Sequence, residues 1–112
     1  MPVPDSSLLK TLRALDGSPE LTQRELAREL GVSLGKANYC LRALLAKGLL
    51  KAHNFRNSTN KRGYAYLLTP EGVAEKASLT RRFLALKRKE YDALRLEIEQ
   101  LQSESDTAAR AG

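Results

Sequence analysis

Basic side chains gather in the middle of the sequence, in an interval that has no acidic ones. There is no Asp or Glu between Glu29 and Glu71, whereas lysine or arginine occurs at Lys36, Arg42, Lys47, Lys51, Arg56, Lys61 and Arg62. Such an interval suits contact with phosphate groups, because a carboxylate there would repel a nucleic-acid backbone. A basic face that only solvent contacts is the alternative. We call residues 30–70 the acid-free window and predict that it binds double-stranded DNA, in agreement with a net charge of +6.

The first half of this window contains side chains that can read base edges. A helix expected over residues 33–47 has an outward face formed by Ser33, Leu34, Gly35, Lys36, Asn38, Tyr39 and Arg42, of which Ser33, Lys36, Asn38, Tyr39 and Arg42 are the predicted contacts. In the major groove, Asn38 can read adenine, and Lys36 or Arg42 can read guanine or hold a phosphate. Tyr39 can contact a phosphate or a thymine methyl group, or instead pack partly buried. Thr22 and Gln23, which begin the preceding helix, are expected to contact the DNA backbone.

The second half of the window contains a polar turn, RNSTNKRG, over residues 56–63. Apolar residues flank it on both sides, in LLKAHNF before it and YAYLLT after it, so the turn is expected to be the tip of a β-hairpin. Its contact residues are predicted to be Arg56, Asn57, Lys61 and Arg62. Arginine at such a tip can enter a narrow minor groove. A loop that only solvent contacts is the alternative.

Two short helices, expected over residues 21–50, must position these side chains. Thr22 and Glu25 have the spacing of a capping box, and Ser33 is placed to cap the second helix. Gly31 is expected in the turn between the helices, and Gly48 is expected to end the second one in the left-handed conformation. Inward-facing apolar residues are predicted at Leu26, Ala27 and Leu30 on the first helix and at Ala37, Leu41, Leu44 and Leu45 on the second. This pair of helices predicts a helix-turn-helix.

The remaining elements follow from their own start and stop signals. After a loose arm at residues 1–4, Asp5 or Ser6 is expected to cap a helix whose buried face is Leu8, Leu9, Leu12 and Leu15. Strands are expected over residues 49–55 and 64–69. Thr69 is the expected cap of a last helix, with Pro70 at its first position. That helix is predicted to run to about Ser103, followed by a disordered tail at residues 104–112.

This order of elements, together with two sequence segments, resembles a known family. LARELGVSLGKANYCLRALLAKGLL and YAYLLTPEG are similar to the corresponding segments of MarR-like winged helix-turn-helix regulators. The resemblance implies a DNA-binding transcriptional regulator. The fold predicted is mainly α with a small β-hairpin (α+β), with a winged domain at residues 5–75 and a long C-terminal dimerisation helix at 76–103. ALKRKEYDALRLEIEQL resembles a small MarR-type subgroup associated with exopolysaccharide gene clusters, which implies exopolysaccharide genes as targets.

The last helix is expected to bind a second copy of the chain. Its apolar stripe consists of Leu79, Phe83, Leu86, Tyr91, Leu94, Ile98 and Leu101. Residues 81–89 are basic and residues 90–106 mainly acidic, so an antiparallel pair would place opposite charges side by side. We therefore predict an antiparallel homodimer that binds an inverted repeat, with half-sites about 34 Å apart. Alternatively, the helix folds back on its own domain or its basic half contacts DNA.

Other residue types exclude several functions. Cys40 is the only cysteine, so neither an intramolecular disulfide nor a cysteine-based metal site is expected, and a small buried residue is the favoured interpretation over a redox sensor. His53 has no second histidine to work with and is expected on a strand surface. Neither a catalytic site, a cofactor nor a metal is predicted. The sequence shows neither a signal peptide nor a membrane span, which favours a cytoplasmic, nucleoid-associated bacterial protein. A protein-interaction adaptor is the alternative function.

Overall fold

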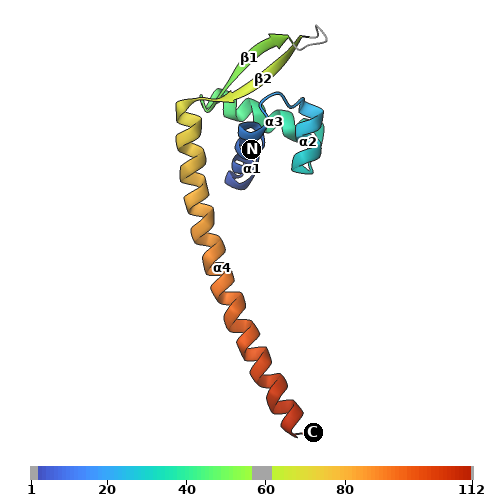
Figure 1. The fold of residues 1–112 in the computed structure, drawn as a ribbon, viewed down its shortest axis with the longest axis vertical. Coiled ribbons are helices and arrows are strands. Elements are labelled where there is room, and N and C mark those ends of the chain that lie inside the picture. The colour runs from blue at the N-terminus through green and yellow to red at the C-terminus, as the bar shows by residue number, and fades with distance from the viewer. Residues whose placement is uncertain (1–2, 57–61, 112) are drawn as a thin grey trace. The chain divides into compact units, whose positions relative to one another are not determined.

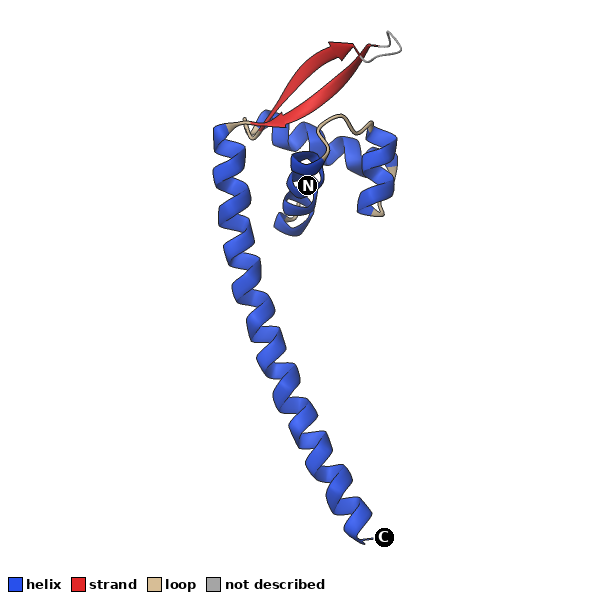
Figure 2. Ribbon diagram, viewed as in Figure 1, coloured by secondary structure: helices blue, strands red, loops and turns tan. Residues whose placement is uncertain are grey.

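The computed structural model describes residues 3–56 and 62–111, which form four helices and one hairpin (Figure 1). The elements are α1 (Asp5–Gly17), α2 (Gln23–Leu30), α3 (Leu34–Ala46), β1 (Leu50–Arg56), β2 (Arg62–Leu68) and α4 (Pro70–Ala111). The chain divides into two compact units, Met1–Leu79 and Thr80–Gly112. The first unit has the predicted winged helix fold, with a two-stranded antiparallel sheet as its wing (Figure 2).

α1 begins differently from the expectation. Neither Asp5 nor Ser6 is the N-cap residue, because the helix begins at Asp5 and the N-cap residue is Pro4, whose side chain makes no capping hydrogen bond. The backbone carbonyl of Pro4 instead accepts from the N–H groups of Ser7 and Leu8, at 3.0 and 3.1 Å. Asp5 is the first helical residue, where its negative charge interacts favourably with the helix dipole. The predicted buried face is confirmed.

α1 also buries a polar residue that the apolar pattern does not reveal. Thr11 has no solvent-exposed surface, and its hydroxyl donates a 2.8 Å hydrogen bond to the Ser7 carbonyl one turn earlier. This bond satisfies the hydroxyl inside the core, where an unpaired polar group would be destabilising. Thr11 therefore packs as a core residue.

The predicted caps of α2 and α3 are confirmed. The Thr22 hydroxyl oxygen accepts from the Glu25 N–H at 3.1 Å, and the Glu25 carboxylate accepts from the Thr22 N–H at 3.0 Å. The Ser33 hydroxyl oxygen accepts from the Lys36 N–H at 3.1 Å. Gly31 and Gly48 have φ angles of 68° and 71°, in the left-handed region that glycine adopts without a steric penalty.

The wing begins and ends one or two residues away from the predicted positions. Its strands pair in a register that runs from Leu50↔Leu68 to Arg56↔Arg62. Arg56 and Arg62 therefore belong to the strands and not to the turn between them. β2 is also held to the segment before α2, because the Tyr66 N–H donates to the Pro19 carbonyl at 2.9 Å.

A set of hydrogen bonds joins the start of α4 to the turn after α3. Thr69 caps α4 as predicted, since its hydroxyl oxygen accepts from the Gly72 N–H at 3.0 Å. The same hydroxyl donates to the Gly48 carbonyl at 2.6 Å, and the Thr69 N–H donates to the Leu49 carbonyl at 3.1 Å. Gly72 lies so close to Leu49 that a Cβ atom would overlap the Leu49 carbonyl oxygen. We call these contacts of Gly48 and Leu49 with Thr69 and Gly72 the junction.

α4 is longer than expected and belongs to both units. It is helical to Ala111, so residues 104–111, predicted to be disordered, continue the helix. In the first unit its side chains pack on that unit: Leu79 is fully buried, and the Lys76 ammonium lies 2.7 Å from the Asp16 carboxylate of α1. Leu79 was predicted to face a second copy of the chain, but it lies in the core of its own winged unit.

That core is aliphatic and is made by every element of the winged unit. Its fully or nearly fully buried apolar residues are Leu8, Leu9, Leu12, Leu15, Leu26, Ala27, Ala37, Cys40, Leu41, Leu44, Leu50, Ala65 and Leu79. Branched leucine side chains from three helices supply most of its volume, and burying each is worth about 2 kcal/mol relative to exposing it. The core fixes the inward face of α3 and thereby the residues that α3 turns to solvent.

Candidate nucleic-acid interface

The outward face of α3 is the centre of the candidate interface. Its inward positions are Ala37, Cys40, Leu41 and Leu44, all buried. At 100° per residue, the opposite side of the helix holds Gly35, Tyr39 and Arg42, which are all exposed. Tyr39 has 48% of its surface exposed, so about half of its surface is accessible to a ligand. Lys36 is exposed and Asn38 half-buried at the two margins of this face.

Gly35 is a candidate contact that the predicted site omits. It lies in the first turn of α3, on the exposed face, and a Cβ atom added there would meet nothing within 4 Å. Its φ is not positive and no neighbour requires the space, yet glycine is less favourable than alanine in a helix by up to about 1 kcal/mol. A glycine without a packing role on an exposed helix start is the signal in the sequence. It allows a ligand to approach the backbone of α3 closely.

The start of α2 supplies a second group of contacts. Thr22 is exposed and Gln23 half-buried. The Thr22 oxygen already accepts the capping hydrogen bond from Glu25, but its hydroxyl hydrogen can still be donated to a phosphate. The Glu25 carboxylate lies at the same helix end, held there by the Thr22 N–H. The capping box thus orders the end of α2 that carries both predicted contacts.

The capping hydrogen bonds lower the pKa of Glu25. The largest cause is the hydrogen bond from the Thr22 N–H to its carboxylate, followed by the hydrogen bond with the Thr22 side chain, and Arg28 adds a smaller attraction. All three favour the ionised form, so the pKa falls below the ordinary glutamate value of 4.5.

This shift predicts a pH dependence of folding. Because the folded pKa of Glu25 is lowered, its contribution to stability is present above pH 4.5 and is lost as the pH falls through the lowered value. We expect Glu25→Gln to make the free energy of unfolding less steeply dependent on pH between about 3 and 5, measured by urea denaturation. Glu29→Gln, at an exposed position of the same helix, is the control for loss of one negative charge. An unchanged slope in Glu25→Gln would contradict the role of the carboxylate.

The wing brings three further residues to the start of α2. A hollow of about 240 Å³ is lined by Glu20, Leu21, Thr22, Gln23, Gly63, Tyr64 and Tyr66. Tyr64 has 61% of its surface exposed, and its hydroxyl can donate to a phosphate in the way proposed for Thr22. The sequence pattern marks Tyr64 as a strand residue, and only the fold of the wing reveals that it adjoins Thr22 and Gln23.

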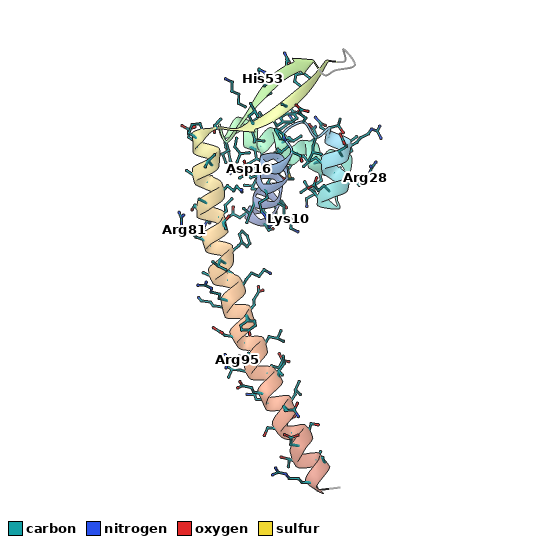
Figure 3. All side chains as sticks on the ribbon, viewed as in Figure 1. Lys10, Asp16, Arg28, His53, Arg81 and Arg95 are labelled. Carbon is teal, nitrogen blue, oxygen red and sulfur yellow. The ribbon has the colours of Figure 1, made fainter. Side chains whose placement is uncertain are left out.

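The structure describes only the backbone of two of the four predicted wing-tip contacts. Asn57 and Lys61 lie outside the described residues. The backbones of Arg56 and Arg62 end the two paired strands, and their side chains lie outside the described part as well. Along β1, Lys51, His53 and Asn54 are exposed, so the hairpin extends the acid-free surface beyond α3. Figure 3 shows where His53 lies on this strand.

The structure supports few other chemical roles. Cys40 is 1% exposed in the core, where it packs as a small apolar residue, and His53 lies on the surface of β1 as predicted. Among the residues described, no three or more His, Cys, Asp or Glu side chains gather in a group that could hold a metal ion. Within the same residues, no helix has the length and apolar character needed to cross a bilayer.

A family model of winged helix-turn-helix DNA-binding domains matches residues 4–51, which cover α1, α2 and α3 and the start of β1. Over these residues the chain is similar to winged helix-turn-helix DNA-binding domains, in agreement with the winged helix fold of its first unit. No curated protein sequence matches the chain of this winged helix protein significantly. The residues matched by the family model include the whole of α3, whose exposed face is the centre of the candidate interface.

Solved structures similar to this winged helix protein include transcriptional regulators. A PadR-like regulator from Bacillus cereus has a TM-score of 0.71 at 16% identity, with 78% of this chain and 89% of that one covered. FabT from Streptococcus pneumoniae, in complex with DNA, has a TM-score of 0.56 at 25% identity, with 76% and 58% covered. MarR from E. coli has a TM-score of 0.56 at 28% identity, with 68% and 55% covered. The predicted resemblance to MarR-like regulators is thus confirmed, whereas the exopolysaccharide-associated subgroup is not tested.

Proposed function

We propose that this protein is a sequence-specific regulator of transcription that binds double-stranded DNA as a homodimer. In this proposal α3 enters the major groove, with Lys36, Asn38, Tyr39 and Arg42 as its contacts, and Gly35 lets the helix approach closely. The tip of the wing reaches the minor groove. Thr22, Gln23, Ser33 and Tyr64 hold the DNA backbone.

One observation carries the proposal. The exposed face of α3 lies entirely within the acid-free window, so base-reading side chains and phosphate-binding charges occupy the same surface. A solvated basic face would not require an ordered, outward-facing set of Tyr39, Arg42 and Gly35 on the second helix of a helix-turn-helix. The DNA complex of FabT, at 25% identity, shows that a protein of this fold binds DNA.

The homodimer is proposed from the second unit. From Leu84 to Leu101, α4 exposes large apolar side chains, with 49–65% of their surface accessible at Leu84, Leu86, Tyr91, Leu94, Leu96, Ile98 and Leu101. A single helix that exposes this much apolar surface is expected to bury part of it against a second chain. Two winged units related by a two-fold axis would bind the two halves of an inverted repeat.

A mobility-shift titration at several salt concentrations tests DNA binding against the adaptor alternative. A protein that neutralises several phosphates loses affinity linearly in the logarithm of the salt concentration, by about 10³-fold or more between 50 and 200 mM for six or more contacts. We expect this dependence on an inverted repeat selected from random sequence. An adaptor that binds a protein partner would show no salt-dependent shift of duplex DNA.

Alanine substitutions on α3 test which surface binds. Lys36→Ala and Arg42→Ala are each expected to weaken binding to the selected site by about 10-fold, because each removes a base or phosphate contact worth about 1–3 kcal/mol. Lys10→Ala is the matched control, since Lys10 is an exposed lysine of α1 outside the acid-free window (Figure 3). Affinity that stays unchanged in both α3 variants would refute the assignment of α3.

The targets are proposed from the C-terminal segment. Its resemblance to the subgroup associated with exopolysaccharide gene clusters supports exopolysaccharide genes as the regulated genes. Genome-wide footprinting of the protein in its native bacterium tests this. Sites concentrated upstream of genes of another class would contradict the proposed target while leaving DNA binding intact.

A further inference from the structure

The exposed apolar residues of α4 form a seam with a seven-residue period. Leu84, Tyr91 and Ile98 are seven residues apart, and Leu94 and Leu101 follow Tyr91 and Ile98 by three. These five side chains are 49–65% exposed, and Lys87 occupies the one remaining position of the same pattern. Alternating steps of three and four residues are the pattern of a coiled coil. Leu86 and Leu96, although also exposed, lie off this seam.

Charges flank the seam with opposite sign on its two sides. One side holds Arg81, Arg88 and Arg95, which are seven residues apart, and the other holds Glu90, Glu97 and Glu104 at the same spacing. All six side chains are exposed. Such flanking positions lie next to the partner helix in a coiled coil and select its orientation.

We infer that two copies of the chain pair through this seam in parallel and in register. In a parallel pair, the acidic flank of each helix meets the basic flank of the other, so that Glu90 of one copy lies beside Arg95 of the second copy. In an antiparallel pair, like flanks meet, and arginines would face arginines and glutamates would face glutamates. This inference rests on the homodimer proposed above and adds its orientation.

The apolar residues fit a pair of helices. In a parallel coiled coil, a β-branched residue at the first core position of a heptad, with leucine at the fourth, favours two strands over three or four. Ile98 and Leu101 have these positions, and Leu94 is also at a fourth position. Lys87 is the polar residue of the seam, and its ammonium lies 3.1 Å from the Glu90 carboxylate of the same helix. A single charged core residue of this kind fixes the register of the pair at some loss of stability.

The division of α4 into a basic half and an acidic half favours an antiparallel pair. It has a smaller effect on the orientation than the charges that flank the seam. Much of that charge lies on the outer side of the heptad, at Arg82 and Lys89 in the basic half and at Asp92, Glu99 and Asp106 in the acidic half. Exposed charges that do not touch the partner are screened over about 8–10 Å at physiological salt. Flanking positions lie next to the partner helix in a coiled coil, so the flanking charges would decide the orientation.

The orientation determines where the two winged units can be. Leu79 ends the winged unit and Thr80 begins the second one. In a parallel pair the two Thr80 residues are one interhelical distance apart, about 10 Å. In an antiparallel pair centred between Tyr91 and Leu94 they are about 38 Å apart, at a rise of 1.5 Å per residue. A parallel pair therefore starts both winged units at the same end of the coiled coil.

Cysteine cross-linking of the full chain tests the orientation. Leu101→Cys is expected to form a disulfide-linked dimer under mild oxidation, because residue 101 faces itself in a parallel pair and lies about 25 Å from itself in the antiparallel one. An equimolar mixture of Leu84→Cys and Leu101→Cys chains is expected to give no 84–101 disulfide by mass spectrometry. The unaltered chain, whose Cys40 is buried, is the control.

A charge substitution gives an independent result of opposite sign for the two orientations. Glu90→Arg is expected to raise the dimer dissociation constant about tenfold in a parallel pair, since two attractions become repulsions. In an antiparallel pair it would lower that constant by placing Arg beside Glu97. Asp92→Arg makes the same charge change on the outer side and is the matched control, and Glu90→Arg combined with Arg95→Glu is expected to restore dimerisation.

The outcomes separate this inference from the proposed function. A Leu101→Cys disulfide together with weaker dimerisation of Glu90→Arg supports the parallel pair. An 84–101 disulfide, or tighter dimerisation of Glu90→Arg, would overturn the orientation and leave the homodimer standing. An unaltered chain that sediments as a monomer at 100 μM would overturn both, and DNA binding by that monomer would remain measurable by mobility shift.

Discussion

Gly72→Ala is expected to lower the free energy of unfolding by about 3 kcal/mol, although it only adds one methyl group. This is the largest effect on stability that we predict. The added methyl group would overlap the Leu49 carbonyl oxygen and lie 3.0 Å from the carbonyl carbon. Leu49 cannot easily move away, because its N–H donates to Leu44 at 3.0 Å and its carbonyl accepts from Thr69 at 3.1 Å. The strain would fall on the junction between α3 and α4.

Gly35→Ala is the matched control for this substitution. Both glycines lie in the first turn of a helix, but a Cβ atom at position 35 would meet nothing within 4 Å. Alanine is the better helix former, so Gly35→Ala is expected to raise stability by up to about 1 kcal/mol. Urea denaturation followed by circular dichroism measures both. Equal effects of the two substitutions would mean that helix propensity and not the contact with Leu49 decides the outcome.

Placing charge in the seam of α4 is expected to have the largest effect on function. Leu94→Asp combined with Leu101→Asp would bury four carboxylates in a two-stranded interface, so we expect a monomer by analytical ultracentrifugation. Affinity for the inverted repeat is expected to fall by 100-fold or more, because the second half-site is no longer bound by a linked domain. Affinity for a single half-site is expected to stay within about twofold.

Leu96→Asp gives the control for this second prediction. Leu96 is as exposed as the seam residues, at 60%, and lies on the same helix, but it is off the seam. We expect it to dimerise and bind the inverted repeat normally. A seam variant that remained a dimer would show that the two copies meet elsewhere and would refute α4 as the interface.

The local structure of the winged unit could be predicted from sequence because its signals are short-range. The residues that cap or end α2 and α3 interact with neighbours no more than four positions away. All of them take the predicted roles, namely Thr22 with Glu25, Ser33, Gly31 and Gly48. The predicted N-cap of α1 was wrong because both Pro4 and Asp5 are residue types that occur at helix starts. The presence of a capping side chain at Asp5 did not decide between them. Residues 104–111 lack an apolar face but contain nothing that breaks a helix, and they continue α4.

Long-range relations could not be predicted in this way. Leu79 fits the apolar stripe of α4 equally well as a core or an interface residue, and only the packed winged unit shows that it is buried. Leu84 was missed because the predicted stripe follows the neighbouring apolar residues Phe83 and Leu86, which lie off the seam. Tyr64 adjoins Thr22 and Gln23 only once the wing is folded beside α2.

In the proposed homodimer, the burial of Leu79 would link folding of the winged unit to the concentration of the protein. The helix that supplies this core residue continues directly into the seam, so a second copy that binds the seam binds only chains in which α4 is formed. A partner that binds the folded and not the unfolded chain stabilises the folded state by mass action. A cell that makes little of this protein would then hold it as less stable chains exposed to proteases, and a cell that makes more would accumulate it disproportionately.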